Sequence, residues 1–469
     1  MIGGLMKTTS RFAVAAAAGL FVGGIALTPA QAADLGGDCC ADLEERVAEL
    51  EATTVRKGNR KVSVKLSGQV NRALLFWDDG DESDVYSVDN NTTNTRIRLT
   101  GDAKFKPGWS AGYYLEWQTV STSSGSVNQL TPSAGASDFG LRHAVWYIKS
   151  DKLGSVWLGQ HSMATDNLIY MNVVGTSVSN GGGDLLSGGG FLLTQPGVTG
   201  NARLVGASWG TYYANFDVGN RSDIIRYDSP DIWGCVFSTA WGENDDWDVA
   251  LRCKKELNSV KILFGIGYIE HTGNEGSVVG DGTSLLTGAI HGQNDFIVSA
   301  GILHDPTGLF LTGWYADRDF DSITNQTTGG AAIALGTGVT APGDVETWYI
   351  EGGIYRRFND LGKTALYINY AESEGSNVGV IDRLPLTGGG ISAATSVVLS
   401  SEVQIWGGGI VQEITNAAME LYIDYKHLEF DGRVCNAGFT AAAGCPAGQT
   451  LNVTSDDLDL VLVGGRIKF

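Results

Sequence analysis

The chain has 469 residues, of which 65 are glycine and 43% are hydrophobic, and its formal net charge is −20. A mean hydropathy of only −0.02 excludes a bundle of membrane helices, because each such helix needs about 20 consecutive apolar residues. The acidic balance argues against nucleic acid as a partner, since phosphate backbones are bound by basic surfaces.

Residues 1–32 are predicted to be a signal peptide. Lys7 and Arg11 precede the apolar run Phe12–Leu27, and Ala30-Gln31-Ala32 offers small residues for cleavage before Ala33. Removing this segment takes away two basic and no acidic residues, which leaves a formal charge of about −22. Export would place the cysteines in an oxidising compartment, where disulfides form and persist.

Residues 33–58 are expected to form a short periplasmic helical arm. Leu43, Val47 and Leu50 are spaced four and three apart, which favours a small coiled coil between subunits, and a solvated arm is the alternative. Cys39 and Cys40 are adjacent, which is too short a pair to form a metal site alone, and intermolecular pairing is open to them.

Residues 59–469 are predicted to form an all-β domain, a transmembrane antiparallel β-barrel of about 16 strands. The expected strands are 61–77, 91–106, 109–119, 139–149, 155–161, 221–229, 235–241, one starting at 247, 260–270, 293–304, 309–317, 345–356, 363–372, 402–413, 417–429 and the closing strand within 455–469. Short and long connections alternate between them, and the first long one is the acidic loop 78–90. Outer-membrane barrels have this asymmetry, with short periplasmic turns, long outside loops and both ends periplasmic.

The faces of the expected strands alternate in character. Leu421 and Ile423 alternate with Glu420 and Asp424, so one face suits lipid and the other water. The residues expected to face the lumen are Asp102, Lys104, Glu116, Glu420, Asp424 and Lys426. The last strand ends on Phe469, whose apolar ring is expected to serve in assembly where the last strand pairs with the first.

Four further cysteines lie in or near expected strands. Cys435 and Cys445 lie close together in a Gly/Ala-rich segment, and we expect them to form a disulfide that clips a loop. Cys235 and Cys253 flank a short loop almost symmetrically. Two interpretations remain open: a disulfide across a hairpin, or two reduced thiols that face lipid.

The sequence gives little support for an enzyme. Gly206–Gly210 matches the G-x-S-x-G pattern around Ser208, but the following Thr211-Tyr212-Tyr213 is not a helical start, and the nucleophile elbow needs a strand, a turn and a helix. The six histidines lack metal-ligand spacing. We therefore expect no enzymatic activity, no metal and no cofactor.

The longest connection, residues 162–220, is predicted to be the third loop of the barrel and to fold into the lumen. Its acids would face a basic wall, and opposed charges across a narrow pore create a transverse field. The residues expected at this constriction are Arg96, Arg98, Arg142, Arg221, Arg226, Asp166 and Asp184. The acidic total predicts negative vestibules and a moderate preference for cations.

Several blocks of the sequence carry a family resemblance: Asp42–Thr54, Arg60–Ser63, Ser67–Asn71, Arg96–Gly101, Tyr227–Gly234 and the terminal Phe469. On these blocks the chain resembles the Gram-negative trimeric porins, and most closely the alphaproteobacterial ones. The resemblance implies a homotrimer of sixteen-stranded barrels in the outer membrane that passes small hydrophilic solutes through an eyelet formed by the third loop. It also implies outer-membrane lipid and the barrel assembly machinery as partners. The third loop lacks the Pro-Glu-Phe-Gly-Gly type of motif found in enterobacterial relatives.

Three other functions remain as alternatives at this point. A substrate-selective channel of about 18 strands would carry a stacked aromatic or basic ladder, and an outer-membrane hydrolase would use Ser208. A soluble exported β-protein would be recovered without detergent.

Overall fold

The computed structural model describes residues 61–133, 138–183, 185–217, 221–271, 289–324, 327–328, 331–332, 341–380, 397–435 and 445–469. The predictions for the signal peptide, the helical arm, Cys39, Cys40 and Asp184 lie outside these residues. In the described part, no helix is both long and apolar enough to cross a membrane.

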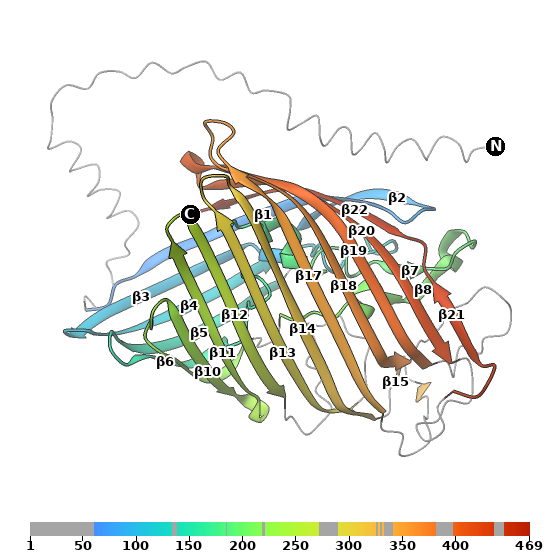
Figure 1. Cartoon of the computed structure of the whole chain (residues 1–469), viewed down its shortest axis with the longest axis horizontal. Helices are drawn as coiled ribbons and strands as arrows, with labels where there is room; N and C mark the ends of the chain where they lie inside the picture. The colour runs from blue at the N-terminus through green and yellow to red at the C-terminus, as the bar shows by residue number, and fades with distance from the viewer. Residues whose placement is uncertain are drawn as a thin grey trace.

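Sixteen strands of the described residues close into one antiparallel barrel, as the sequence predicts (Figure 1). They are β1 (Lys65–Asp78), β3 (Arg96–Lys106), β4 (Trp109–Val120), β5 (Asp138–Ser150), β6 (Gly154–Ser162), β9 (Arg221–Asp228), β10 (Cys235–Gly242), β11 (Trp247–Leu257), β12 (Val260–His271), β13 (Ala289–His304), β14 (Leu309–Thr324), β17 (Ala341–Arg356), β18 (Thr364–Val380), β19 (Val397–Ile414), β20 (Met419–Cys435) and β22 (Leu458–Lys468). The ring closes where β22 pairs with β1, for example at Ile467 and Val70. Closure leaves no open edge of the kind that would expose unpaired backbone groups to lipid.

Two further strands lie beside the ring. β2 (Ser83–Asp89) pairs with the second half of β1, while β3 pairs with the first half, Lys65–Gln69. β21 (Thr450–Thr454) pairs in the same way with the end of β20. The prediction that residues 78–90 form only a loop was therefore wrong. Tyr86 and Val88 alternate there as buried side chains, which is enough apolar surface to hold a strand.

The strands of the second half extend further toward the long connections than expected. The sequence predicts ends at residues 317 and 372, whereas β14 runs to Thr324 and β18 to Val380. The apolar alternation stops at those points, but the backbone ladder continues through Ser376, Gly379 and their partners. Backbone pairing needs no apolar side chain, so periodicity underestimates strand length there.

The outer face of the barrel is apolar. Many large apolar side chains alternate with inward-facing ones and stay exposed: Leu74, Trp146, Ile148, Val156, Leu158, Ile225, Leu311, Ile350 and Ile368. A continuous apolar exterior on a closed sheet is what a lipid-facing surface requires.

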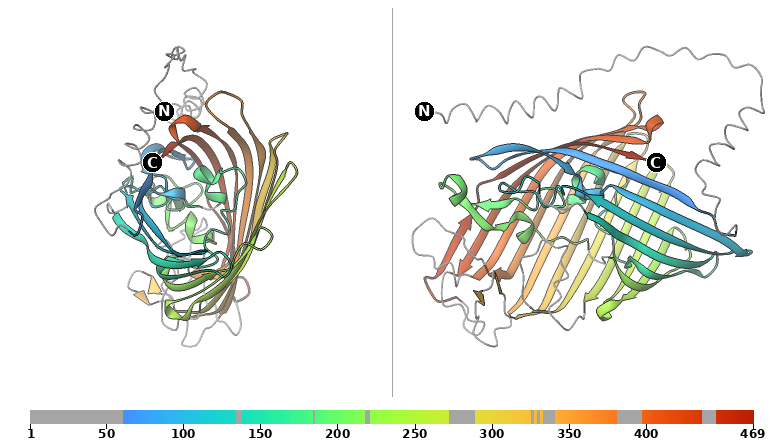
Figure 2. Two further views of the ribbon diagram at one scale, coloured as in Figure 1. Left: turned by 90° about the vertical axis from the view of Figure 1, so that its left-hand side faces the viewer. Right: turned by 180° about the vertical axis from the view of Figure 1, so that it is seen from behind.

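The connection between β6 and β9 contains short elements and is largely buried. These are α3 (Ser177–Asn180), η2 (Gly181–Gly183), β7 (Leu192–Thr194), η3 (Gly200–Arg203), β8 (Leu204–Ser208) and α4 (Trp209–Tyr212). The remaining short elements are η1 (Asn91–Thr93), η4 (Glu243–Asp245), η5 (Thr415–Ala417) and the pair β15 (Thr327–Thr328) and β16 (Ala331–Ala332). Figure 2 shows the connection in green among the strands of the ring, seen from two sides.

Hydrogen bonds join this connection to strands far from its own ends. The backbone and hydroxyl of Thr165 donate to Asp248 of β11, and the indole of Trp314 in β14 donates to the Gly182 carbonyl at 2.6 Å. Ser179 lies 2.8 Å from the hydroxyl of Tyr367 in β18. The described part of residues 163–217, which we call the inner segment, is thus fixed against β11, β14 and β18.

Candidate pore constriction

Three arginines converge on one buried carboxylate. Arg98 of β3 is paired with Glu116 of β4 in the strand register and contacts its Oε2. Arg96 Nη1 lies 3.4 Å and Arg142 Nε 2.7 Å from Glu116 Oε1, and the Tyr114 hydroxyl donates to Oε2 at 2.6 Å. Glu116 has no exposed surface, so these partners are what stabilise its charge.

This arrangement adds a partner that the sequence did not predict. The sequence predicts that Arg96, Arg98 and Arg142 face acids of the long loop, whereas their ion pairs go to Glu116 on the neighbouring strand. Side chains at opposite or diagonal positions of paired strands can reach each other. The expectation that the arginines pair with acids of the long loop did not take this into account. The register shift at Glu116 and Trp117 also leaves Arg142 as the extra residue of β5, beside Glu116.

A polar cavity of about 390 Å³ lies beside these arginines. Its basic lining side chains are Arg96, Arg142, Arg221 and Arg466, and its acidic one is Asp217 of the inner segment. The walls are completed by polar residues of the turn Asn91–Asn94 and by Gln118. Four guanidinium groups against one carboxylate make this cavity positive.

A second and larger cavity, of about 780 Å³, contains the other two predicted constriction residues, Arg226 and Asp166. Arg226 pairs with Asp228 at 2.9 Å and donates to the carbonyls of Ser162 and Met163. The two cavities share Asn167 in their linings, so they adjoin one another along the β3–β9 side of the barrel.

The inner segment is packed against the opposite wall. Asn180 lies 2.9 Å from the Tyr349 hydroxyl and also contacts Glu351, which is fully buried. The Tyr367 hydroxyl donates to Asp424 at 2.6 Å, and Lys426 Nζ donates to the Asn180 carbonyl. Tyr349, Glu351 and Tyr367 were not predicted from the sequence, although the alternation Tyr349–Glu351 places both on one side of β17.

The remaining predicted lumen residues are placed as follows. Asp102 and Lys104 are exposed near a short turn, where Ser63 Oγ donates to Asp102 Oδ1 at 3.2 Å. Glu420 pairs with Arg466 at 2.6 Å and with Lys468 at 2.7 Å. Asp424 and Lys426 are buried against the inner segment and not in open water.

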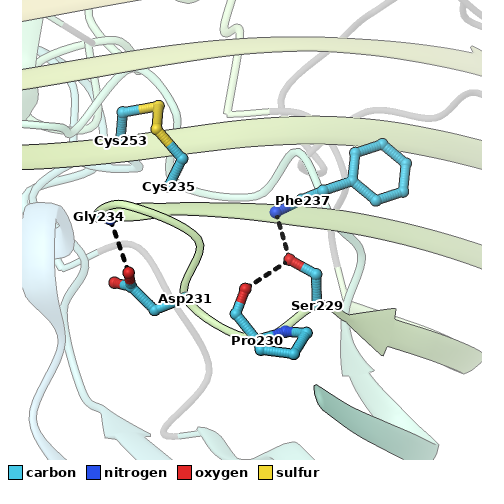
Figure 3. Close-up of a disulfide and its surroundings, with 7 residues drawn as sticks. All are labelled: Ser229, Pro230, Asp231, Gly234, Cys235, Phe237 and Cys253. Atoms are coloured by element: carbon cyan, nitrogen blue, oxygen red, sulfur yellow. Dashed lines mark hydrogen bonds between the residues drawn. A yellow bond between two sulfur atoms is a disulfide. The ribbon is translucent and has the colours of Figure 1, made fainter. Parts of the chain in front are cut away.

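Two disulfides are present in the residues that the structure describes. One joins Cys435 to Cys445 at the end of β20. The other joins Cys235 of β10 to Cys253 of β11, which are direct partners in the ladder with their Cα atoms 4.0 Å apart (Figure 3). Cys235 shares its side of β10 with the exposed Phe237 and Trp241, so this bridge lies on the outer face.

The turn beside the second bridge is held by its own side chains. Asp231 Oδ1 accepts from the Gly234 amide at 2.6 Å, and Ser229 Oγ accepts from the Phe237 amide and donates to the Pro230 carbonyl (Figure 3). Trp233 and Gly234 both have positive φ, at 58° and 83°, which closes the turn so that Ile232 and Cys235 exchange backbone hydrogen bonds.

One local expectation around Ser208 was wrong. Trp209–Tyr212 do form a single helical turn, because Ser208 and Thr211 cap it with reciprocal hydrogen bonds. The hydroxyl of Ser208 lies 3.2 Å from that of Thr211. In the described part of the chain, no group of three or more His, Cys, Asp or Glu side chains could hold a metal ion.

A closed sixteen-stranded barrel with an apolar exterior and charged internal cavities is a channel protein of the outer membrane. A family model described as "Gram-negative porin" matches residues 13–433. The chain belongs to this family and is an outer-membrane diffusion channel for small hydrophilic solutes. None of the curated proteins matches the chain.

Solved structures are similar to this chain at low sequence identity, and of the three that follow only the first reaches a TM-score of 0.50. The anion-selective porin from Comamonas acidovorans is 15% identical, with a TM-score of 0.50 over 87% of this chain and all of that chain. OmpT of Vibrio cholerae is 11% identical, with a TM-score of 0.48 over 88% of this chain and 99% of that chain. Salmonella typhi OmpF is 13% identical, with a TM-score of 0.43 over 87% and 98%.

Proposed function

We propose that this porin is a passive diffusion channel whose constriction lies between the arginine wall of β3, β5 and β9 and an inner segment that occupies the lumen. The observation that carries the proposal is the smaller cavity, with Arg96, Arg142, Arg221 and Arg466 facing Asp217. The hydrogen bonds of the inner segment to β11, β14 and β18 support a segment folded inside the ring. The open passage then follows the β3–β9 side.

The charge of the constriction favours anions. Glu116 neutralises part of the wall from behind, and Glu420 contacts Arg466, yet the lining retains an excess of positive charge. The acidic total favours cations in the wider vestibules, but selectivity is decided where every ion passes within a Debye length of the wall, ~8 Å at physiological salt. We therefore expect a modest anion preference in place of the cation preference expected from net charge.

A reversal-potential measurement in planar bilayers tests this proposal. In a tenfold KCl gradient, the reversal potential should have the same sign as the chloride equilibrium potential. Arg221→Gln should shift it toward the potassium equilibrium potential. Arg433→Gln is the matched control, because Arg433 is exposed near the end of β20 and outside both cavity linings. A cation-directed potential in the unmodified channel would contradict the assignment of the constriction.

Other parts of the proposal concern assembly. We propose a homotrimer of the alphaproteobacterial branch, with the seam Leu43–Val47–Leu50 as an accessory contact and the outer-membrane lipid and assembly machinery as partners. The sequence blocks described above support the branch. The sixteen strands of the ring leave the eighteen-stranded selective channel without support, and the porin class points to a channel and not to an enzyme.

A further inference from the structure

A row of aromatic rings lies on the inner side of β4, β5 and β6. The ring centroids of Tyr147 and Trp157 are 4.4 Å apart, those of Trp157 and His161 5.1 Å, those of His161 and His143 4.9 Å, and those of His143 and Tyr114 4.7 Å. We call these five residues the aromatic row. All but Tyr147 line the larger cavity directly. The row leads from the short turns of the barrel toward Glu116.

The rings are held in place before any solute arrives. The Trp157 indole donates to Ser155 Oγ at 3.1 Å, and the Tyr114 hydroxyl donates to Glu116 at 2.6 Å. His143 and His161 share one hydrogen bond between their Nδ1 atoms, 3.0 Å apart. Rigid rings lose little conformational entropy when a ligand stacks on them.

The same cavity also contains polar groups suited to hydroxyls. Arg226 and Asp228 form a 2.9 Å pair, which offers a donor and an acceptor side by side. Asp166 is only 5% exposed, and no described residue makes a hydrogen bond to its Oδ1. A buried carboxylate oxygen without a partner is costly, so a donor brought by a ligand would be favourable there.

The charges of the cavity are mixed. Its basic residues are Lys149, Arg226 and Arg252, and its acidic residues are Asp151, Asp166, Asp228 and Asp231. Neither sign dominates, unlike in the smaller cavity, so electrostatics selects neither anions nor cations. A purely apolar solute would desolvate these groups without replacing their hydrogen bonds.

We propose that the larger cavity is a binding subsite for neutral carbohydrate. The C–H face of a pyranose ring stacks on Trp157 and its neighbours in the aromatic row, while ring hydroxyls reach Asp166 and the Arg226–Asp228 pair. The cavity volume of about 780 Å³ lies within the range of roughly 300–1,000 Å³ common for small-molecule sites. This inference rests on the proposed diffusion channel and gives it a solute class.

Sugar block of the ionic current tests the inference. Maltotriose and sucrose are added to purified channels in a planar bilayer, with polyethylene glycol of similar hydrodynamic size as the comparison. We expect saturable block by the sugars at millimolar concentration and no saturation with polyethylene glycol. Trp157→Ala should raise the half-blocking concentration about tenfold, Trp157→Phe less, and Asp166→Asn should also weaken block.

The matched control is Trp146→Ala, because Trp146 lies on the neighbouring strand but is 47% exposed on the outer face. It should leave sugar block unchanged. Equal block by sugar and polyethylene glycol, or identical half-blocking concentrations in the unmodified channel and Trp157→Phe and Asp166→Asn, would overturn the subsite. A conducting channel without sugar block would contradict this inference alone. A protein that conducts no ions would contradict the proposed channel itself.

Discussion

At the scale of single residues, Glu116 decides the charge of the constriction wall. It is the common partner of Arg96, Arg98 and Arg142 and is completely buried. Like-charged guanidinium groups could not lie so close together without it, because their repulsion would be strong away from bulk water.

Glu116→Gln should therefore change both stability and selectivity. Losing the charge at a buried pair costs roughly 3–5 kcal/mol, so the temperature at which the barrel unfolds in heat-modifiability gels should fall. Surviving channels should show a larger anion preference in the KCl gradient. Asp102→Asn is the control, since Asp102 is exposed and its carboxylate accepts a hydrogen bond from Ser63 Oγ. An unchanged reversal potential in Glu116→Gln would show that the three arginines do not set selectivity.

At the scale of elements, the seam between β1 and β22 holds the ring closed. Phe469 exchanges backbone hydrogen bonds with Gly68 at 2.8 and 3.1 Å, and its ring covers the space where a Cβ of residue 68 would lie. A Cβ there would also come 2.5 Å from the Arg96 carbonyl oxygen, which cannot move without breaking the ladder.

Gly68→Val should impair closure for that reason, and deleting Phe469 should impair it by removing both hydrogen bonds and the apolar ring. We expect less folded barrel in the outer membrane for both variants, measured by heat-modifiability gels. Gly352→Ala is the control, since a Cβ there would meet only ordinary contacts at 3.4 Å and beyond. Wild-type assembly of both test variants would refute this role of the seam.

The disulfide between β10 and β11 leads to a second prediction at the scale of elements. Its two strands are already joined by a continuous ladder from Cys235–Cys253 to Trp241–Trp247, and the bridge lies on the outer face. Replacing Cys235 and Cys253 together with Ser should lower the heat-modifiability temperature and leave single-channel conductance unchanged. A changed conductance would mean that the bridge shapes the lumen.

At the scale of the whole molecule, the trimer is expected to depend on large apolar outer surfaces more than on the arm. Deleting Asp34–Thr54 should lower the yield of trimers in native gels without abolishing conductance, because the ring begins only at β1. Loss of all conductance on deletion of the arm would assign the arm to the barrel.

The sequence was sufficient for the barrel and insufficient for its interior. Alternation such as Leu421–Ile423 against Glu420–Asp424 follows directly from the two-residue period of a strand, so strand number and facing could be predicted. The contact of Arg142 with Glu116 could not, because it depends on a register shift between β4 and β5 at Glu116–Trp117 that leaves no sign in the sequence. Trp157 and Arg226 are direct partners in the β6–β9 ladder, and Asp166 shares their cavity only because of the path of the inner segment.

The seam also has a kinetic consequence. Val70 and Ile467 are neighbours in space but 397 residues apart in the sequence, so the ring can close only after β22 has been made. Bringing such ends together costs about 5 kcal/mol in loop-closure entropy for a flexible chain of this length. Until then, β1 and β22 would each present an unpaired edge, which lipid penalises by several kcal/mol per backbone group. We therefore expect closure to be the slow step of biogenesis, and a template that pairs transiently with both edges to accelerate it most.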